Sequence, residues 1–506
     1  MEEEEQFEIL KEAVIVPPPP IEDPWYSRPI DVHRWSEHPE LVGLSNVLWA
    51  AHFSDMERAA STPGPRPKTS FRHQFRVLLL DLYVAWLEDP RLCIGVAMSK
   101  NYWDTTSRYN ALNISKQITT IVKRFDDVGL IDLAKGSYGG PYATTNRTTR
   151  IRGSKALRDM FQALTATRDD VKRIESEECI ILREGLVVGD GTKIYDYQDT
   201  DETNRMRDEL QAYNKVLVDT FIDIPGLDEA VVNRTDQFGK AFKQPLDHHH
   251  HHVRRVFSRG SWEMNGRFYG AWWQLIPGEL RKQIYINDTP TVEVDFKGLH
   301  VSLLSAEQGV ILEGDPYTLE GLELPGVPAA LQRSLVKQLV LTALNAKDRK
   351  SAFQSFREGW PANHYGKGLV NDDLSVLLDA FTGQHPHLKE LVCADQGIRL
   401  MNVDSRIAEK VHHHFTRQGI PVLSVHDSFI IDYTRVRELK QAMAEASAAV
   451  VGRPMAVSAS GPGVDEIEPD FRLDFVGWVQ VPRCPAYRRR MSAWEARVGR
   501  DVIPYR

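Results

Sequence analysis

Apolar residues recur at helical spacing in two segments near the start of the chain. Residues 71–87 carry apolar side chains on one helical face and end before Asp89 and Pro90, which predicts a helix. A second helix is expected to begin at Ser115, a good N-terminal cap, and to end at Gly129, a common stop residue.

The pattern then changes to alternating strands. Residues 130–134 form an apolar run, 136–140 are rich in glycine, and a polar run ends in three arginines: Arg147, Arg150 and Arg152. Helices followed by a two-stranded basic wing are typical of a winged helix, in which one helix enters the DNA major groove. We therefore predict a winged-helix-like DNA-binding domain over 69–165. A small helical domain that binds nothing is the alternative.

The remaining polar segments divide the rest of the chain. Residues 1–68, with an acidic start and a proline run at 17–20, read as a partly disordered N-terminal arm. Residues 166–250 read as a linker and thumb-like region. The histidine run at 248–252 is expected to be a solvated loop, because adjacent positions do not converge on one metal ion.

Composition places the chain among soluble globular proteins. Its 506 residues are too many for one ordinary core, and 42% are hydrophobic and 26% charged. No run of eighteen apolar residues and no signal-peptide pattern occurs, so we expect a cytoplasmic protein without a membrane segment. The four cysteines lie far apart, without the CxxC spacing of a zinc site.

The net charge and the local distribution of charge point in different directions. A formal charge of -8 discourages binding to phosphates, which depends on Lys and Arg. However, basic residues crowd one short stretch, at Arg254, Arg255, Arg259, Arg267, Arg281 and Lys282. This stretch indicates a local basic surface that could hold a polymer substrate.

Three segments of the C-terminal half carry candidate chemistry. A β-branched strand ends in Asp295 and runs through Gly298 into a helix. A later helix, 331–345, carries Arg333 and Lys337 four residues apart and so on one face. Finally, apolar runs flank His426 and Asp427, which predicts a hairpin with these polar residues at its turn.

These parts match the needs of nucleotidyl transfer. The reaction uses two divalent ions about 4 Å apart, which at least two carboxylates must bridge, here Asp295 and Asp427. Arg333 and Lys337 could neutralise a triphosphate. Hard oxygen ligands favour two Mg²⁺ ions, with Mn²⁺ able to substitute.

The three segments resemble motifs A, B and C of the family A DNA polymerases and the related single-subunit phage-type RNA polymerases. Asp295-Phe-Lys-Gly-Leu-His300 is similar to the motif DYSQIE, Arg333-x-x-x-Lys337 to the start of the fingers helix, and Val425-His426-Asp427-Ser428-Phe429 to the phage form of motif C. Upstream, Gly266-Arg267, Gln274-Leu-Ile-Pro277 and Arg281 resemble the element that positions primer and template. The likeness covers roughly residues 254–440, with its matches in the correct order.

This resemblance implies an α+β fold over 251–506, in which an antiparallel palm sheet with helices is joined to fingers. It implies that Asp295 and Asp427 bind the metal ions and that Arg333 and Lys337 hold the triphosphate. It further implies that His426 places the primer end, that Arg267, Gln274 and Arg281 contact primer or template, and that His300 and Asn345 lie at the nucleotide.

The sequence also departs from the family. His300 stands where the DNA polymerases keep a Glu that excludes the 2'-hydroxyl, and Asn345 stands where both enzyme types usually have a Tyr. A bulky His can still exclude the 2'-hydroxyl, so we favour deoxynucleotides, and ribonucleotide use stays open. Asp432 and Glu293 are the candidates for a supporting carboxylate.

We therefore predict a DNA polymerase that binds a DNA template, a primer and nucleoside triphosphates. By analogy alone, its role is the replication of a mobile element, and no protein partner is indicated. One alternative is a single-subunit RNA polymerase or primase. The other is a non-catalytic replication initiator that binds DNA and keeps a polymerase fold as a scaffold.

Overall fold

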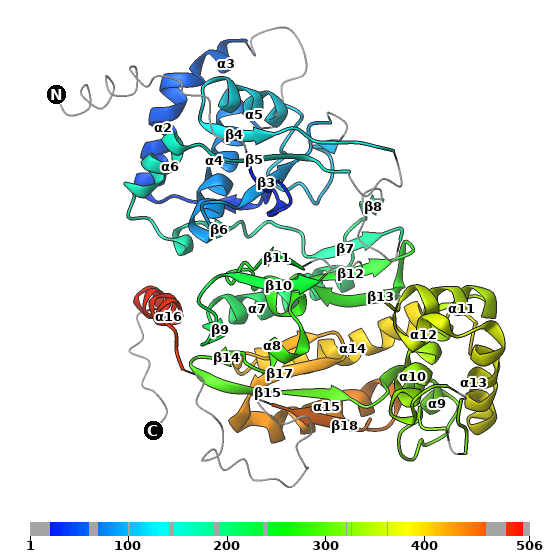
Figure 1. Cartoon of the computed structure of the whole chain (residues 1–506). Helices are drawn as coiled ribbons and strands as arrows, with labels where there is room; N and C mark the ends of the chain where they lie inside the picture. The colour runs from blue at the N-terminus through cyan, green and yellow to red at the C-terminus, as the bar shows by residue number, and fades with distance from the viewer. Residues whose placement is uncertain are drawn as a thin grey trace. The chain divides into compact units, whose positions relative to one another are not determined.

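The structure is a computed structural model, and it divides into two compact units (Figure 1). It describes residues 21–59, 69–99, 102–140, 146–185, 193–235, 241–319, 321–324, 326–361, 363–461 and 482–498. Unit 1 comprises Met1–Glu178, Ala230–Arg234 and Phe242–Asp247, and unit 2 comprises Cys179–Glu229, Thr235–Ala241 and His248–Arg506. No helix in the described ranges is long and apolar enough to cross a membrane.

Unit 1 combines short helices with a four-stranded sheet. Its described helices are α2 (Pro39–His52), α3 (Ser54–Ala59), α4 (Phe71–Glu88), α5 (Ile118–Asp127), α6 (Lys155–Gln162) and the 3-10 turn η2 (Arg168–Asp170). The strand order is β1-β3-β5-β4, formed by β1 (Ser27–Pro29), β3 (Cys93–Val96), β5 (Thr149–Gly153) and β4 (Ile131–Ala134). Strand β1 is parallel to β3, and the other neighbours are antiparallel. Two further pairs join β2 (Arg34–Trp35) to β6 (Lys172–Arg173) and β10 (Val231–Thr235) to β11 (Ala241–Pro245).

Both predicted helices of unit 1 are present. Helix α4 begins where the apolar pattern begins, because the Ser70 hydroxyl caps it by accepting a hydrogen bond from the His73 backbone (3.2 Å). Helix α5 stops before Gly129, which has a φ of 71° and so ends the helix as predicted. The helix begins at Ile118, three residues later than the predicted start at Ser115. In the turn before it, the Ser115 hydroxyl accepts hydrogen bonds from the Gln117 backbone (3.3 Å) and from Gln74 (3.0 Å).

The predicted two-stranded hairpin is also present. Strands β4 and β5 pair from Ile131 with Gly153 to Ala134 with Arg150, and a bridge between Ser137 and Arg147 extends them. Strand β5 lies between β4 and β3 in the sheet. The hairpin therefore projects from a sheet that the helices pack against, and not from a helical bundle alone.

The expected arm over 1–68 is wrong for the residues that form α2 and α3. Leu48 and Trp49 are buried in the same apolar cluster as Phe75 and Phe125, and the Trp49 and Phe75 rings meet edge to face at 5.4 Å. Helix α2 thus contributes to the core of unit 1, because its apolar side needs α4 to cover it. The proline run at 17–20 lies outside the described residues.

Unit 2 is organised around an antiparallel sheet. Its strand order is β16-β17-β15-β14-β9, and β18 pairs with β15 as well. The strands are β16 (Leu423–Val425), β17 (Ser428–Asp432), β15 (Thr289–Phe296), β14 (Tyr285–Ile286), β9 (Ile222–Asp223) and β18 (Val457–Ser460). A second, four-stranded sheet has the order β13-β12-β7-β8, from β13 (Ser261–Tyr269), β12 (Arg254–Ser258), β7 (Ile180–Arg183) and β8 (Ile194–Tyr195). This α+β architecture agrees with the prediction.

The helices of unit 2 occupy different places around its two sheets (Figure 1). Helix α14 packs against β13 and α15 against β15 and β17, whereas α10 to α13 gather at one end of the unit. The described helices are α7 (Asp201–Val218), α8 (Gly278–Arg281), α9 (Leu299–Glu307), α10 (Ala329–Asn345), α11 (Arg349–Glu358), α12 (Tyr365–Gly368), α13 (Asn371–Gln384), α14 (Gly397–Thr416), α15 (Val436–Val451) and α16 (Pro485–Val498). Three 3-10 turns accompany them: η3 (Trp272–Leu275), η4 (Pro386–Leu388) and η5 (Tyr433–Arg435).

The segment expected to be a linker and thumb-like region, 166–250, is divided between the units. Strand β6 belongs to unit 1, whereas β7 and α7 belong to unit 2, which begins at Cys179 and not at 251. The histidine run also differs from the expected solvated loop. His248 and His251 are buried, and the Nδ1 atom of His251 lies 2.8 Å from the Leu217 carbonyl oxygen.

Candidate polymerase site

The antiparallel sheet brings the two predicted catalytic carboxylates together. Strands β15 and β17 pair with Asp295 opposite Ser428, the residue after Asp427. His426 and Asp427 form the two-residue connection between β16 and β17, as the hairpin pattern predicted. Residues directly opposite each other on antiparallel strands have Cα atoms about 5 Å apart, so both carboxylates lie at one point of the sheet.

The turn holds His426 in an uncommon backbone conformation. Its φ is 59°, in the left-handed region that residues other than glycine rarely adopt. Such a conformation costs on the order of 1 kcal/mol and is found where the surrounding structure fixes it. Strand pairing on both sides of the turn supplies that constraint, and as a result Asp427 is held at a fixed place.

The electrostatics of Asp295 show an excess of negative charge. Its side chain is exposed, yet desolvation by the surrounding protein, followed by the charges of Asp427 and Glu293, raises its pKa to about 7. Lys337 lowers the pKa but does not cancel these effects. The carboxylates therefore lack sufficient positive charge of their own, and a bound cation would relieve their repulsion.

Of the two candidates for a supporting carboxylate, Glu293 is the one beside Asp295. It lies two residues earlier on β15, where its Oε1 accepts a hydrogen bond from the Ser428 hydroxyl (2.6 Å) and lies 3.2 Å from the Arg281 guanidinium. Asp432 lies at the other end of β17 and caps the turn η5. Arg281, predicted to contact primer or template, is thus the ion-pair partner of Glu293.

The His426 imidazole lies at the turn next to Asp427. Burial lowers its pKa first, and the charges of Arg267 and Arg281 lower it further against the opposing effect of Asp427. The ring meets Tyr269 edge-on at 5.3 Å. Its Nδ1 atom is buried and has no hydrogen-bond partner among the described residues.

Asp404 is a site residue that we did not predict. It is buried on α14, and its oxygens accept hydrogen bonds from Arg267 Nε (2.9 and 3.0 Å). His300 Nε2 lies 3.3 Å from Asp404 and 3.2 Å from Arg267. The sequence held a signal, because Asp404 interrupts the apolar face formed by Leu400, Ile407, Ala408 and Val411.

Arg333 and Lys337 both lie exposed on α10, on one face as predicted. Lys337 is close enough to Asp295 to lower its pKa. Arg333 forms a two-pronged ion pair with Asp315, with Nη2 at 3.1 Å from Oδ1. A triphosphate could therefore meet Lys337 directly, whereas Arg333 would have to share its guanidinium with Asp315.

Gln274 and Asn345 have structural partners. The Gln274 amide donates to the Phe268 and Ser424 carbonyls (3.0 Å each), which ties the turn η3 to β16. Asn345 Nδ2 donates to the Leu341 carbonyl (2.8 Å) at the end of α10. Neither partner excludes a substrate contact, and the predicted roles of both residues stay predictions.

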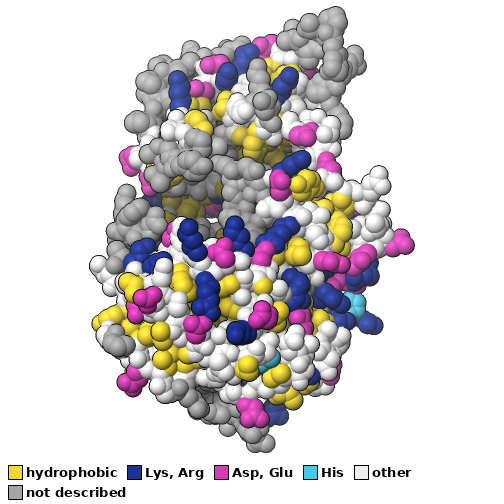
Figure 2. Space-filling model, turned by 90° about the vertical axis from the view of Figure 1, so that its right-hand side faces the viewer, with side chains coloured by type: hydrophobic (Ala, Val, Ile, Leu, Met, Phe, Trp, Pro, Cys, Tyr) yellow, Lys and Arg dark blue, Asp and Glu magenta, His cyan; other side chains and the backbone are white. Residues whose placement is uncertain are grey.

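The basic stretch of 254–282 is largely neutralised, contrary to the expected basic surface. Five of its cations form ion pairs, which are Arg255 with Glu409, Arg259 with Asp395, Arg267 with Asp404, Arg281 with Glu293 and Lys282 with Glu279. Figure 2 likewise shows Lys and Arg side chains interspersed with Asp and Glu on one face of the molecule. The expectation failed because the balancing acids come mostly from distant parts of the chain.

Unit 2 also contains an open groove that does not include the carboxylate pair. Its volume is about 1570 Å³, and α7, α14 and α15 supply most of its walls. Arg406, Lys410 and Arg417 line one side, and Glu202 and Glu209 line another. Because the groove lacks Asp295 and Asp427, it is not the candidate polymerase site.

Comparison with known proteins adds little to this geometry. No protein-family model matches the sequence, and no curated protein matches it. Among solved structures, the chain is similar to the POL domain of Pol1 from M. smegmatis, in a complex with DNA primer-template and dNTP. The identity is 11%, with 83% of this chain and 73% of that chain covered, and the TM-score is 0.28. A TM-score this low carries no argument, so function has to be inferred from the residues themselves.

Proposed function

We propose that the chain is a template-directed nucleotide polymerase that extends a primer 3' end and uses Asp295 and Asp427 to bind two magnesium ions. The observation that carries this proposal is that Asp295 on β15 lies beside the turn that carries Asp427, 132 positions later, with Lys337 nearby. The ordered resemblance to polymerase motifs supports the same function. Such a site needs rigid carboxylates with a cation nearby. The pairing of β15 with β17 supports the first requirement, and Lys337 on α10 supports the second.

The donor set fits magnesium. The described residues contain no cluster of three or more His, Cys, Asp or Glu that could hold a metal, so two carboxylates are what this site offers. Magnesium is commonly bound by one or two carboxylates together with substrate phosphates and water. When bound, the ions would activate the primer hydroxyl and neutralise the departing pyrophosphate.

The remaining residues would position the substrates. Lys337, with Arg333, would hold the triphosphate through charge. His426 would orient the primer end from the turn that also carries Asp427. Arg267, held rigidly by Asp404, would contact primer or template, with Gln274 and Arg281 nearby.

Deoxynucleotides are the proposed substrates, with DNA as template. His300 is fixed between Arg267 and Asp404, so it can act as a rigid wall near the nucleotide sugar. Asn345 offers no aromatic surface for stacking, which favours the ribonucleotide alternative of an RNA polymerase or primase. Replication of a mobile element is the proposed role, with DNA as partner.

We further propose that unit 1 is a winged-helix-like module. Helix α4, strand β3, helix α5 and the β4–β5 hairpin follow one another, and the sheet order β3-β5-β4 returns the second hairpin strand beside β3. This arrangement suits a domain that presents a helix and a wing to nucleic acid.

The experiment is nucleotide incorporation by the purified chain on primed and bare templates, with dNTPs or NTPs, and with or without Mg²⁺. We expect Mg²⁺-dependent extension of primed DNA with dNTPs. Extension with NTPs, or product from a bare template, would instead support the RNA polymerase or primase. DNA binding that survives Asp295→Asn, combined with no incorporation by the parent chain, would support the non-catalytic initiator.

A further inference from the structure

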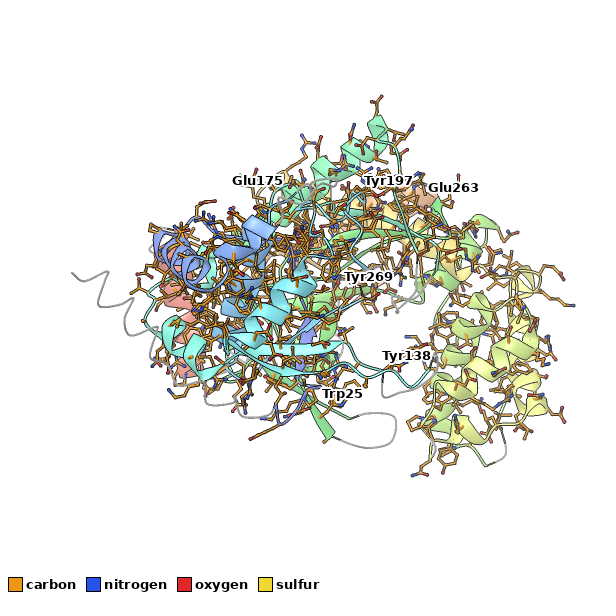
Figure 3. All side chains as sticks on the ribbon, turned by 90° about the horizontal axis from the view of Figure 1, so that it is seen from above. Trp25, Tyr138, Glu175, Tyr197, Glu263 and Tyr269 are labelled. Atoms are coloured by element: carbon orange, nitrogen blue, oxygen red, sulfur yellow. The ribbon has the colours of Figure 1, made fainter. Side chains whose placement is uncertain are left out.

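Two exposed aromatic side chains lie at the β4–β5 hairpin of unit 1. Tyr138, on the hairpin, is 77% exposed, and Trp25, just before β1, is 56% exposed. Figure 3 labels both side chains. Single exposed rings are common on protein surfaces, so the groups that lie beside these two decide whether they form a binding surface.

Arg147 lies beside the Trp25 ring and opposite the residue that precedes Tyr138. Its guanidinium lies 5.7 Å from the centre of the Trp25 ring, and its backbone pairs with Ser137, the residue before Tyr138. Asn146 fixes the hairpin by accepting a hydrogen bond from the Gly139 backbone (2.8 Å). Trp25, Arg147 and Arg150 therefore lie together, and Tyr138 follows Ser137 on the hairpin; we call these four residues the hairpin patch.

The arginines of the hairpin patch have no acidic partner among the described residues. Arg147 and Arg150 form no ion pair within the described parts of the chain, and Arg150 is held by the Ser27 hydroxyl at 2.8 Å. Burial lowers the pKa of Arg150, and the charge of Arg147 lowers it further, which shows that two cations lie close together. Arg152, on the same strand, is instead paired with Asp132 at 2.8 Å.

Unpaired arginines beside exposed rings suit one class of ligand. A strand of nucleic acid carries a phosphate on every residue and a flat base that can stack on an aromatic ring. Bases inside a duplex are not available for such stacking. The exposed end of α5, the usual duplex-reading element, carries Asp126 and Asp127, and its Arg124 is paired with Asp55 at 2.7 Å.

We propose that the hairpin patch binds single-stranded nucleic acid, with phosphates at Arg147 and Arg150 and bases on Trp25 and Tyr138. This goes beyond the proposed polymerase activity, because the surface lies in unit 1 and uses none of the carboxylate site. It also assigns the nucleic-acid contact of unit 1 to the hairpin, and not to a helix that reads duplex DNA.

The test is fluorescence anisotropy of a labelled oligo-dT with the full chain, beside the same measurement with a labelled duplex. The double change of Trp25→Ala with Tyr138→Ala should weaken oligo-dT binding about tenfold or more. Arg147→Ala should weaken it and reduce its dependence on salt. Trp25→Phe, which keeps a ring, should retain most of the affinity, and thermal melting would show that each variant is folded.

Tyr102→Ala is the matched control, because Tyr102 is 65% exposed in the same unit and packs on Trp103 at 5.0 Å. It should leave oligo-dT binding unchanged. Equal losses in Tyr102→Ala and the double variant, or tighter binding to duplex that ignores the aromatic changes, would overturn the proposal. Displacement by poly-glutamate as readily as by oligo-dT would also overturn it. Incorporation assays report on unit 2 separately, so the two proposals can fail independently.

Discussion

The surroundings of carboxylates in unit 1 and on strand β15 of unit 2 shift the carboxylate pKa in opposite directions. Burial by itself would raise the pKa of Asp31 in unit 1. The charges of Arg173 and Arg34 outweigh this effect and hold the pKa well below its usual range. In unit 2 the neighbours of Asp295 are mainly acidic, and its pKa rises to about 7.

The difference distinguishes carboxylates that stabilise the fold from carboxylates that could bind a metal ion. Asp81 of unit 1 is fully buried and lies 2.8 Å from Arg28 and 3.1 Å from Arg34, so its charge is already balanced. The described residues supply too few cations to balance Asp295 and its acidic neighbours. Carboxylates that are paired with Arg or Lys stabilise a fold. Carboxylates that lie close together with too few cationic side chains form a site for a bound cation.

The largest effect that would test this contrast is the loss of a crowded carboxylate. Asp427→Asn keeps the size of the side chain but removes the charge that would hold a cation. Since metal ions supply several kcal/mol of charge stabilisation in the transition state, incorporation should fall about 10³-fold or more. Single-turnover primer extension measures this, and an unchanged rate would contradict the assignment.

Removing a paired carboxylate should instead damage the fold. Asp81→Ala leaves Arg28 and Arg34 buried without their partner, which should cost about 3–5 kcal/mol of unfolding free energy. Hydrogen exchange of peptides from unit 1 would measure it. The control is Asp159→Ala, because Asp159 forms an exposed pair with Lys155 and should cost less than about 1 kcal/mol.

A buried carboxylate that serves the site through another residue should have an intermediate effect. Asp404→Asn weakens the hold on Arg267, so incorporation should fall about 10- to 100-fold. The loss should fall mainly on the KM for primer-template if Arg267 contacts it. Equal loss in Asp404→Asn and in Asp404→Ala, with a matching loss of thermal stability, would point to a purely structural role.

The smallest effect concerns pH. Because the folded-state pKa of Asp295 is about 7, above its ordinary 3.8, the protonated form favours folding, and this stability is lost as pH rises through 7. Asp295→Asn should therefore melt at a higher temperature than the parent at pH 8 and at the same temperature near pH 4. Thermal melts across this range would test the sign.

Activity should follow the same group in the parent chain. Cation binding needs the carboxylate form, so incorporation should increase as pH rises through about 7. Glu293→Gln removes one negative neighbour and should move this rise to lower pH, by less than about one unit. Asp432→Asn, at the other end of β17, should leave the pH profile unchanged.

Local patterns in the sequence predicted what depends on local interactions. Helix α4 followed from its apolar spacing, and the β16–β17 hairpin from the apolar runs beside His426 and Asp427. The pairing of Asp295 with the hairpin came only from the resemblance, because no local pattern reports contacts between distant strands.

The features that were missed depend on distant partners. Short strands such as β3 and β18 are stable only because β5 and β15 pair with them. The cations of the basic stretch form ion pairs with acids such as Glu409 and Asp404, which lie more than 130 positions away. The sequence of α2 was interpreted as part of an arm. Its apolar side chains are buried by α4, and α4 comes only after a proline-rich segment.

The most direct measurement is Mn²⁺ binding by electron paramagnetic resonance, with the chain bound to a dideoxy-terminated primer, its template and the next dNTP. The account predicts two bound Mn²⁺ ions per parent chain at pH 8 and the loss of at least one in both Asp295→Asn and Asp427→Asn. Binding that is the same in all three proteins would contradict it.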